Sequence, residues 1–254
     1  MTFASSADKY DRFMGRYTRS LAPGFADAAG VTSGMTVLDV GCGPGGLTLE
    51  LATRVGSEHV AAIDPAPQFA AACRERNPGA DVREGVAEAL PWRDGSFDAT
   101  LSALVVAFMR DADQGVREMA RVTRSGGTVA ACMWDIAGGG MTMLSMFWAA
   151  ARKLDPDVGG ERGRPGVTEG DLGDRFRRAG LRDVVEGALE ASAEYADFAD
   201  FWEPFTLAVG PTGEYLASLP PDRQARLREA CQAAVPAGPF ALTAKAWYAR
   251  GSSP

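Results

Sequence analysis

Four glycines crowd into the stretch VLDVGCGPGG, residues 37–46, directly after an apolar run. Loops of this kind let a nucleotide approach the backbone closely, because glycine places no side chain in the way. Gly41, Gly43 and Gly46 satisfy the dinucleotide pattern GxGxxG, which alone is a weak signal. No Lys-Ser or Lys-Thr pair follows the glycines, which excludes a nucleoside triphosphate loop. A dinucleotide and a phosphate-free nucleoside both remain open.

Two carboxylates bear on that choice. Asp39 precedes the first glycine by two residues, and no lysine or arginine lies between residues 37 and 53 to meet phosphate charge. This setting favours a ligand with positive charge, such as S-adenosylmethionine with its sulfonium and ammonium groups. Asp64, at the end of the next apolar run, is placed to accept hydrogen bonds from ribose hydroxyls of either kind of nucleotide. It is alternatively the N-cap of the helix expected after Pro65.

Composition excludes several other classes. The net charge of −7 argues against a nucleic-acid or anionic-membrane surface. The single histidine, His59, and the cysteines show no metal-ligand spacing, so no metal is expected. No apolar run has membrane-spanning length and no leader pattern is present, so we expect a cytoplasmic protein. The cysteines, which we expect to be reduced and buried, are Cys42, Cys73, Cys132 and Cys231.

The elements that must position these residues alternate along the chain. Apolar runs predict buried strands, and amphipathic stretches between them predict helices that cover both faces of a parallel sheet. In such sheets the ligand lies at the carboxyl ends of the strands, where the glycine loop falls. The fold class is therefore α/β and Rossmann-like. The strands are expected at residues 35–40 and 59–63, near 82, within 97–106 and at 128–134. A helix leading to a further strand is expected within 168–187, and a last strand at 243–251.

The regular alternation stops after residue 135. Residues 136–165 and 190–240 predict a helical cap or substrate-binding insertion, and residues 158–167 read as a polar linker. Methionine and aromatic residues favour a pocket for a hydrophobic or aromatic molecule. Packing of the cap helices against the sheet is the alternative explanation of the same stripes, and it is the favoured one for any single residue. The residues concerned are Met141, Met143, Met146, Phe147 and Trp148 in one stretch, and Tyr195, Phe198, Phe201, Trp202 and Phe205 in the other.

Four stretches carry a family resemblance: VLDVGCGPGGLTLELA, AAIDPAPQFAAACRER, REGVAEALPWRDGSFDATLSALVV and REMARVTRSGGTVAACMWD. Their order and spacing resemble the class I S-adenosylmethionine-dependent methyltransferases, in particular the small-molecule group related to ubiquinone and menaquinone biosynthesis. The resemblance implies a seven-stranded, mostly parallel sheet of order 3-2-1-4-5-7-6. It also implies three parts: N-terminal helices over the cofactor (1–34), the cofactor-binding core (35–135), and sheet completion with helical cap insertions (136–254).

The resemblance also implies cofactor contacts. In the family an acid often stands where this chain has Val86, so we expect the adenine to meet the backbone there. Tyr10 or Tyr17 is expected to close the site. Carried over residue by residue, the contacts are Asp39, Gly41, Gly43 and Gly45 with the methionine half, Asp64 with the ribose, Pro65, Ala66, Val86 and Ala87 with the adenine, Ser102 and Ala103 with the methionyl end, and Arg16 with the carboxylate.

These observations predict a methyltransferase that uses S-adenosylmethionine, releases S-adenosylhomocysteine and acts on a small, hydrophobic or aromatic molecule. A cofactor-binding regulatory protein without turnover is one alternative, and an NAD-dependent oxidoreductase is the other. Asp135 and Tyr195 are the only side chains that suggest a general base, and the sequence assigns the role to neither. The partner is a small-molecule methyl acceptor, with no nucleic acid or membrane expected.

Overall fold

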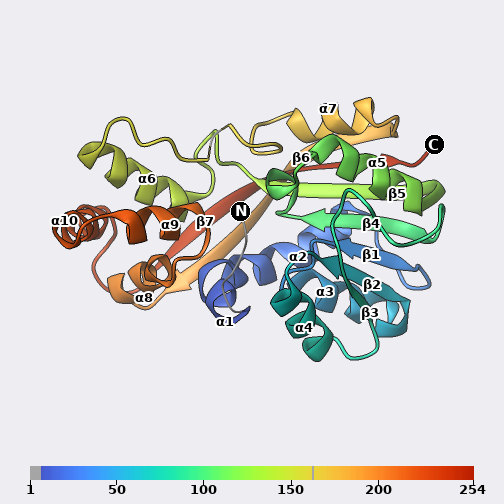
Figure 1. The fold of residues 1–254 in the computed structure, drawn as a ribbon, viewed down its shortest axis with the longest axis horizontal. Helices are drawn as coiled ribbons and strands as arrows, with labels where there is room; N and C mark the ends of the chain where they lie inside the picture. Colours follow the sequence, from blue (N-terminus) through green and yellow to red (C-terminus); the bar gives the residue numbers. More distant parts are fainter. Residues whose placement is uncertain (1–6, 162) are drawn as a thin grey trace.

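The computed structural model describes residues 7–161 and 163–254; residues 1–6 of the expected N-terminal part lie outside the described residues. One seven-stranded sheet of order β3-β2-β1-β4-β5-β7-β6 forms the centre of the molecule (Figure 1). This order confirms the predicted fold class. The strands are β1 Val37–Val40, β2 Val60–Asp64, β3 Asp81–Glu84, β4 Phe97–Ala103, β5 Thr123–Trp134, β6 Arg182–Tyr195 and β7 Phe240–Ser252.

Parallel pairing brings the carboxyl ends of the central strands together. β1 pairs in parallel with β2 and with β4, and β5 continues the parallel set beside β4. β7 alone reverses direction, because it is antiparallel to both β5 and β6. All residues of β1 and β2 are buried, as expected for strands covered on both faces. The loops after β1, β2 and β4 therefore meet at one edge of the sheet.

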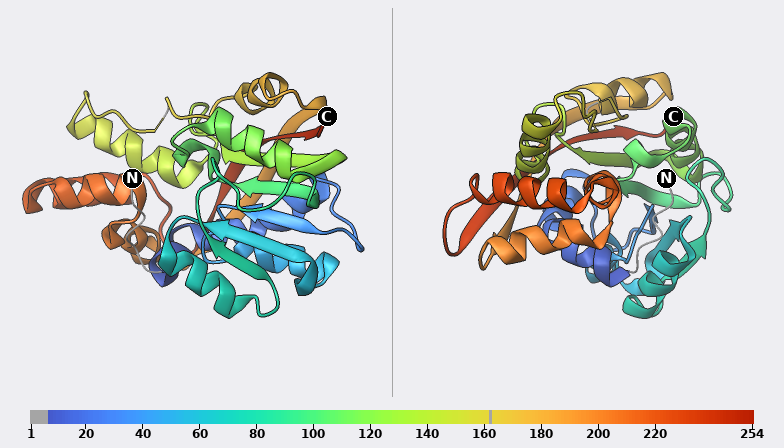
Figure 2. Two further views of the ribbon diagram at one scale, coloured as in Figure 1. Left: turned by 45° about the vertical axis from the view of Figure 1, so that its right-hand side comes forward. Right: turned by 60° about the vertical axis from the view of Figure 1, so that its left-hand side comes forward.

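Helices cover both faces of the sheet. Leu47 and Leu51 of α3 join α2 in one apolar core, and Val116 of α5 joins Phe176 of α7 in the core on the opposite face. Figure 2 shows these two layers from other sides. The helices are α1 Ala7–Tyr10, η1 Asp11–Gly15, α2 Arg16–Ala28, α3 Gly46–Val55, η2 Ser57–His59, α4 Pro67–Arg76, η3 Val106–Phe108, α5 Ala112–Val122, α6 Thr142–Leu154, α7 Asp171–Arg178, α8 Phe198–Trp202, η4 Glu203–Leu207, α9 Gly210–Ser218 and α10 Pro221–Gln232.

The long antiparallel pair β6–β7 extends beyond the rest of the sheet and carries α6, α8, α9 and α10 around its far part (Figure 1). Tyr195, which falls within the helical cap expected over residues 190–240, is instead the last residue of β6, and α8 begins at Phe198. Phe147 of α6 stacks on Phe205 of η4 with ring centroids 4.7 Å apart. No helix of the described residues is long and apolar enough to cross a lipid bilayer.

Candidate functional site

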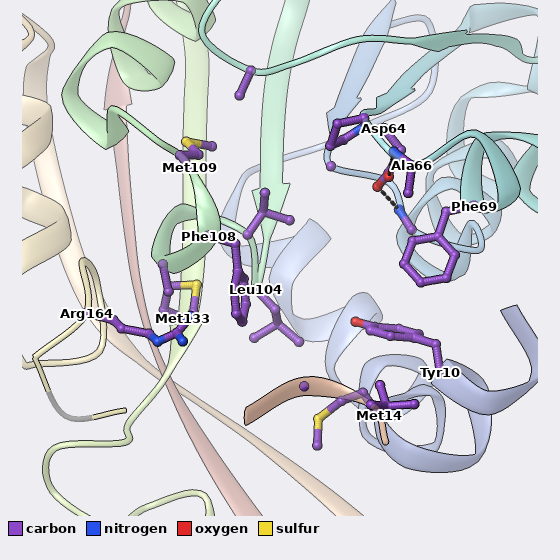
Figure 3. A pocket seen from close by; sticks show the side chains of 18 of the residues that line it. Tyr10, Met14, Asp64, Ala66, Phe69, Leu104, Phe108, Met109, Met133 and Arg164 are labelled. Atoms are coloured by element: carbon purple, nitrogen blue, oxygen red, sulfur yellow. Dashed lines mark hydrogen bonds between the residues drawn. The ribbon is translucent and has the colours of Figure 1, made fainter. Parts of the chain in front are cut away.

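A cavity of about 450 Å³ opens where the loops after β1, β2, β4 and β5 converge, and η1 and α9 contribute to its walls (Figure 3). This volume lies within the range of small-molecule sites, about 300–1,000 Å³. Figure 3 shows Asp64 and Arg164 at opposite sides of the cavity, with Leu104 and Phe108 between them. Of the predicted cofactor contacts, the cavity is lined by Gly41, Gly43, Asp64, Pro65, Ala66, Val86 and Ala87.

The glycines of the loop after β1 are needed for two different reasons. Gly41, Gly43 and Gly45 all have positive φ, at 77°, 53° and 94°. A Cβ on Gly41 would lie 2.4 Å from a side-chain carbon of Val105, and one on Gly45 would lie 2.4 Å from the Asn77 amide nitrogen. A Cβ on Gly43 would meet nothing within 4 Å. Close packing therefore requires glycine at 41 and 45, whereas Gly43 faces open space of the cavity, and Gly45 is not among the lining residues.

Asp64 is held at the cavity by two backbone amides. Gly43 donates its N–H to Oδ2 at 2.8 Å, and Ala66 donates to Oδ1 at 2.9 Å. Burial raises the pKa of this carboxyl, and the two amide donors oppose the rise. The expected helix begins at Pro67 with Ala66 as its N-cap residue, so Asp64 precedes the cap. Its carboxylate ties the loop after β1 to the loop after β2.

Asp39 lies beneath the glycine loop and is not among the lining residues. Its side chain is 1% exposed and accepts a 2.7 Å hydrogen bond from the Thr48 hydroxyl of α3. Burial, reinforced by the charge of Asp64, raises the pKa of Asp39 to about 7, and the bonds from Thr48 oppose the rise. The structure therefore shows this acid in contact with α3, and a direct contact with a cationic ligand stays a prediction.

The end of β4 reaches the cavity two residues later than expected. The Ser102 hydroxyl is buried and donates to the Val40 carbonyl of β1 at 3.1 Å, and Ala103 is half-buried. Neither residue is among those that line the cavity. Leu104 and Val105 do. Leu104 has φ +64°, in the left-handed region that non-glycine residues rarely adopt. Such strain is often found at functional sites.

The N-terminal segment covers one side of the cavity. Tyr10, Phe13 and Met14 are lining residues, and the Tyr10 ring meets Phe69 edge-on at 5.4 Å. Arg16, in contrast, is directed to the cap: its guanidinium pairs with Asp200 at 2.9 Å and lies 4.6 Å over the Tyr195 ring. It is not among the lining residues.

Neither side chain that suggested a general base lines the cavity. Tyr195 is 1% exposed and its hydroxyl lies 3.0 Å from the hydroxyl of Tyr17, which is also buried. Burial raises the pKa of both phenols. The Asp135 carboxylate accepts from the Gly138 amide at 2.8 Å and from Lys245 Nζ at 3.1 Å. Both groups connect elements of the fold.

The end of the cavity away from Asp64 is apolar with a few polar groups. Met133 lies near the end of β5, Ile136 follows that strand, and Leu144 comes from α6. The predicted aromatic stripes do not reach it: Phe147 and Phe201 are fully buried in the packed core. No signal in the sequence marks the charged lining residues Glu161, Arg164, Glu88 and Arg110, or Thr212.

Comparison with known proteins gives the family. A family model described as a methyltransferase domain matches residues 38–131. An uncharacterized protein of Mycobacterium tuberculosis is 32% identical over 209 residues, which cover 78% of this chain and 73% of that protein. A demethylmenaquinone methyltransferase of Desulfitobacterium hafniense is 31% identical over 170 residues, which cover 62% of this chain and 66% of that protein.

The fold has solved counterparts. A crystal structure of an S-adenosylmethionine-dependent methyltransferase from Thermotoga maritima aligns with a TM-score of 0.56 and 15% identity, covering 97% of this chain and 94% of that one. At this identity the likeness shows the fold alone. The matching domain model, the relatives and the strand order agree. The chain belongs to the class I S-adenosylmethionine-dependent methyltransferases, and S-adenosylmethionine is its cofactor.

Proposed function

We propose that this enzyme transfers a methyl group to a small, hydrophobic or aromatic molecule bound at the β5 end of the cavity. The observation that carries the proposal is the continuity of the cavity, which runs from Asp64 past Leu104 to Met133 and Ile136. One continuous space thus has a polar end suited to a nucleoside and an apolar end suited to an acceptor. The similarity to a demethylmenaquinone methyltransferase supports an acceptor of this kind.

The residues at the polar end fit the cofactor. Each oxygen of Asp64 already accepts one amide and retains a lone pair, so the carboxylate suits the two ribose hydroxyls. Pro65, Ala66, Val86 and Ala87 offer an apolar slot for the adenine, and the open space at Gly43 admits the methionine half. Glu88, one residue beyond Ala87, accepts the backbone amide of Arg110 at 2.7 Å, which orders this wall.

The chain's own contribution to the reaction is positioning and exclusion of water. The cofactor supplies the activated methyl group when bound. Tyr10, Phe13 and Met14 close one side of the cavity, and Leu104 lies between its two ends. We further propose that the chain has three functional parts: an N-terminal part that covers the cofactor (1–34), a cofactor-binding core (35–135), and a part that completes the sheet and caps the acceptor (136–254).

Calorimetric binding and methyl transfer test this function together. We expect S-adenosylmethionine and S-adenosylhomocysteine to bind and NADH not to bind, and Asp64→Asn to weaken S-adenosylhomocysteine binding at least about tenfold by removing an acceptor. Asp157→Asn, an exposed acid away from the cavity, is the matched control. Incubation with labelled cofactor and a pool of aromatic metabolites is expected to label a small product. Tight binding with no labelled product would indicate a regulatory protein instead.

A further inference from the structure

Three polar side chains lie at the acceptor end of the cavity: Glu161, Arg164 and Thr212. Glu161 and Arg164 belong to the segment between α6 and α7, and Thr212 belongs to α9. Glu161 is 7% exposed and Thr212 is fully buried. Buried polar groups at an otherwise apolar wall are costly unless they are hydrogen-bonded. Their presence beside the cavity therefore calls for a function.

Glu161 is fixed in place by its neighbours. Trp148 of α6 donates its indole N–H to Oε1 at 3.4 Å. Arg164, three residues along the chain, acts on Glu161 through its positive charge, and its guanidinium carbon lies 5.1 Å from the Phe108 ring centroid. Figure 3 shows Arg164 beside Phe108 and Met133. A carboxylate and a guanidinium group from one segment thus line the same apolar end of the cavity.

Thr212, the third polar residue at this end, carries an unpaired hydroxyl. Its hydroxyl oxygen is buried, and within the described residues it has no hydrogen-bond partner. Most buried hydroxyls in proteins are paired, so this one marks an unsatisfied polar position directly behind the cavity surface. The hydroxyl can donate and accept.

We propose that Glu161 accepts the proton of an ionisable hydroxyl on the methyl acceptor, and that Arg164 holds the hydroxyl oxygen. The inference rests on the proposed function. The acceptor oxygen gains a bond to the methyl carbon, and the electron pair of the broken sulfur–carbon bond stays on sulfur. The hydroxyl proton passes to the Glu161 carboxylate and from there to solvent. The acceptor is therefore an apolar, ring-sized molecule with a phenol-like hydroxyl.

The charges favour a hydroxyl over an amine. Arg164 stabilises the negative charge that grows on a phenolic oxygen, and it repels a protonated amine. Burial raises the pKa of Glu161, Arg164 and Trp148 lower it, and Glu214 of α9 raises it. A raised carboxyl pKa matches a proton acceptor better to a weakly acidic hydroxyl near neutral pH.

The binding test uses 2-naphthol, 2-methoxynaphthalene and 2-naphthylamine, with the protein saturated with S-adenosylhomocysteine. We expect wild type to bind 2-naphthol most tightly, and Glu161→Gln to weaken that binding about tenfold without changing the affinity for 2-methoxynaphthalene. Glu169→Gln, an exposed acid of the neighbouring loop, is the control and is expected to match wild type. Arg164→Gln gives a second variant with the same expected direction.

The turnover test follows labelled methyl transfer to 2-naphthol. Loss of a general base typically lowers the rate about 10²- to 10⁴-fold, so we expect this loss in kcat for Glu161→Gln, with the acid limb of the pH profile abolished. Equal binding of the three probes, no binding of 2-naphthol, or a Glu161→Gln variant with wild-type kcat and pH profile would overturn the inference. Unchanged S-adenosylhomocysteine affinity in those cases would leave the proposed function standing.

Discussion

The Asp64 carboxylate accepts the backbone N–H of Gly43 at 2.8 Å, so the acid after β2 and the glycine loop after β1 form one structural unit. The same carboxylate also accepts the Ala66 amide, which precedes α4. Because both of its oxygens are engaged by the backbone, the orientation of the carboxylate is set before any ligand arrives. This preorganisation lowers the conformational cost of binding.

Two glycine substitutions separate packing from cavity space. Gly41→Ala and Gly43→Ala incur a similar penalty for positive φ, about 1–2 kcal/mol. Only Gly41→Ala also places a methyl group against Val105. We expect Gly41→Ala to lower the free energy of unfolding by clearly more than Gly43→Ala, and Gly43→Ala to fold and lose S-adenosylhomocysteine affinity. Urea unfolding and calorimetry measure the two effects. Equal stability losses would contradict the packing argument.

The raised pKa of Asp39 predicts that the free energy of unfolding depends on pH. Its pKa rises from 3.8 to about 7 on folding, so the folded protein favours the protonated form. This carboxyl therefore gives its full stabilisation below about pH 4 and loses it as the pH rises through 7. The loss amounts to at most about 4 kcal/mol.

The comparison that isolates this effect is Asp39→Asn. In cofactor-free protein, we expect the unfolding free energy of wild type relative to Asp39→Asn to decline between pH 4 and pH 8. The amide keeps an acceptor for the Thr48 hydroxyl and does not titrate. A difference that stays constant across this range would show that Asp39 is ionised without cost in the folded protein.

Substitution of Phe147 tests whether the aromatic stripe belongs to the packed core. The ring is fully buried and stacks on Phe205 at 4.7 Å. Truncation of such a residue typically costs about 3–5 kcal/mol. We expect Phe147→Ala to lower the unfolding free energy by this amount and to leave S-adenosylhomocysteine affinity unchanged in the folded fraction. Ile136→Ala, at the cavity wall, is the comparison, with a smaller stability loss and a larger loss of acceptor binding.

Substitution of Arg16 tests its contact with the cofactor carboxylate, which only the family resemblance implies. Its guanidinium pairs with Asp200 and donates to the Glu194 carbonyl, at 2.9 Å in each case. We expect Arg16→Ala to lower stability by about 1 kcal/mol, since the pair is partly exposed, and to change S-adenosylhomocysteine affinity less than twofold. A loss of affinity that Asp200→Ala does not reproduce would place Arg16 at the cofactor carboxylate after all.

The fold and the polar end of the cavity were predictable from the sequence because both depend on local signals. Buried parallel strands are continuous apolar runs, and a glycine loop followed by an acid at the next strand end is readable from spacing alone. Asp64 and Gly43 were found in this way and Val86 only through the family resemblance, and the structure places all three at the cavity.

The acceptor end was missed because nothing local marks it. Residues 158–167 have the composition of a solvent-exposed linker, yet tertiary packing buries Glu161 against Trp148. Arg16 and Ser102 fall at positions that the family pattern suggests, but their side chains contact Asp200 and Val40. Which way a side chain points depends on neighbours distant in sequence, and spacing does not encode it.

The most direct test of the account is a crystal structure with S-adenosylhomocysteine. We expect both ribose hydroxyls within hydrogen-bond distance of the Asp64 carboxylate, the adenine between Pro65 and Val86, and remaining open space bounded by Met133, Ile136 and Glu161. A ligand bound without contact to Asp64, or one that fills the β5 end and leaves no room for an acceptor, would contradict it.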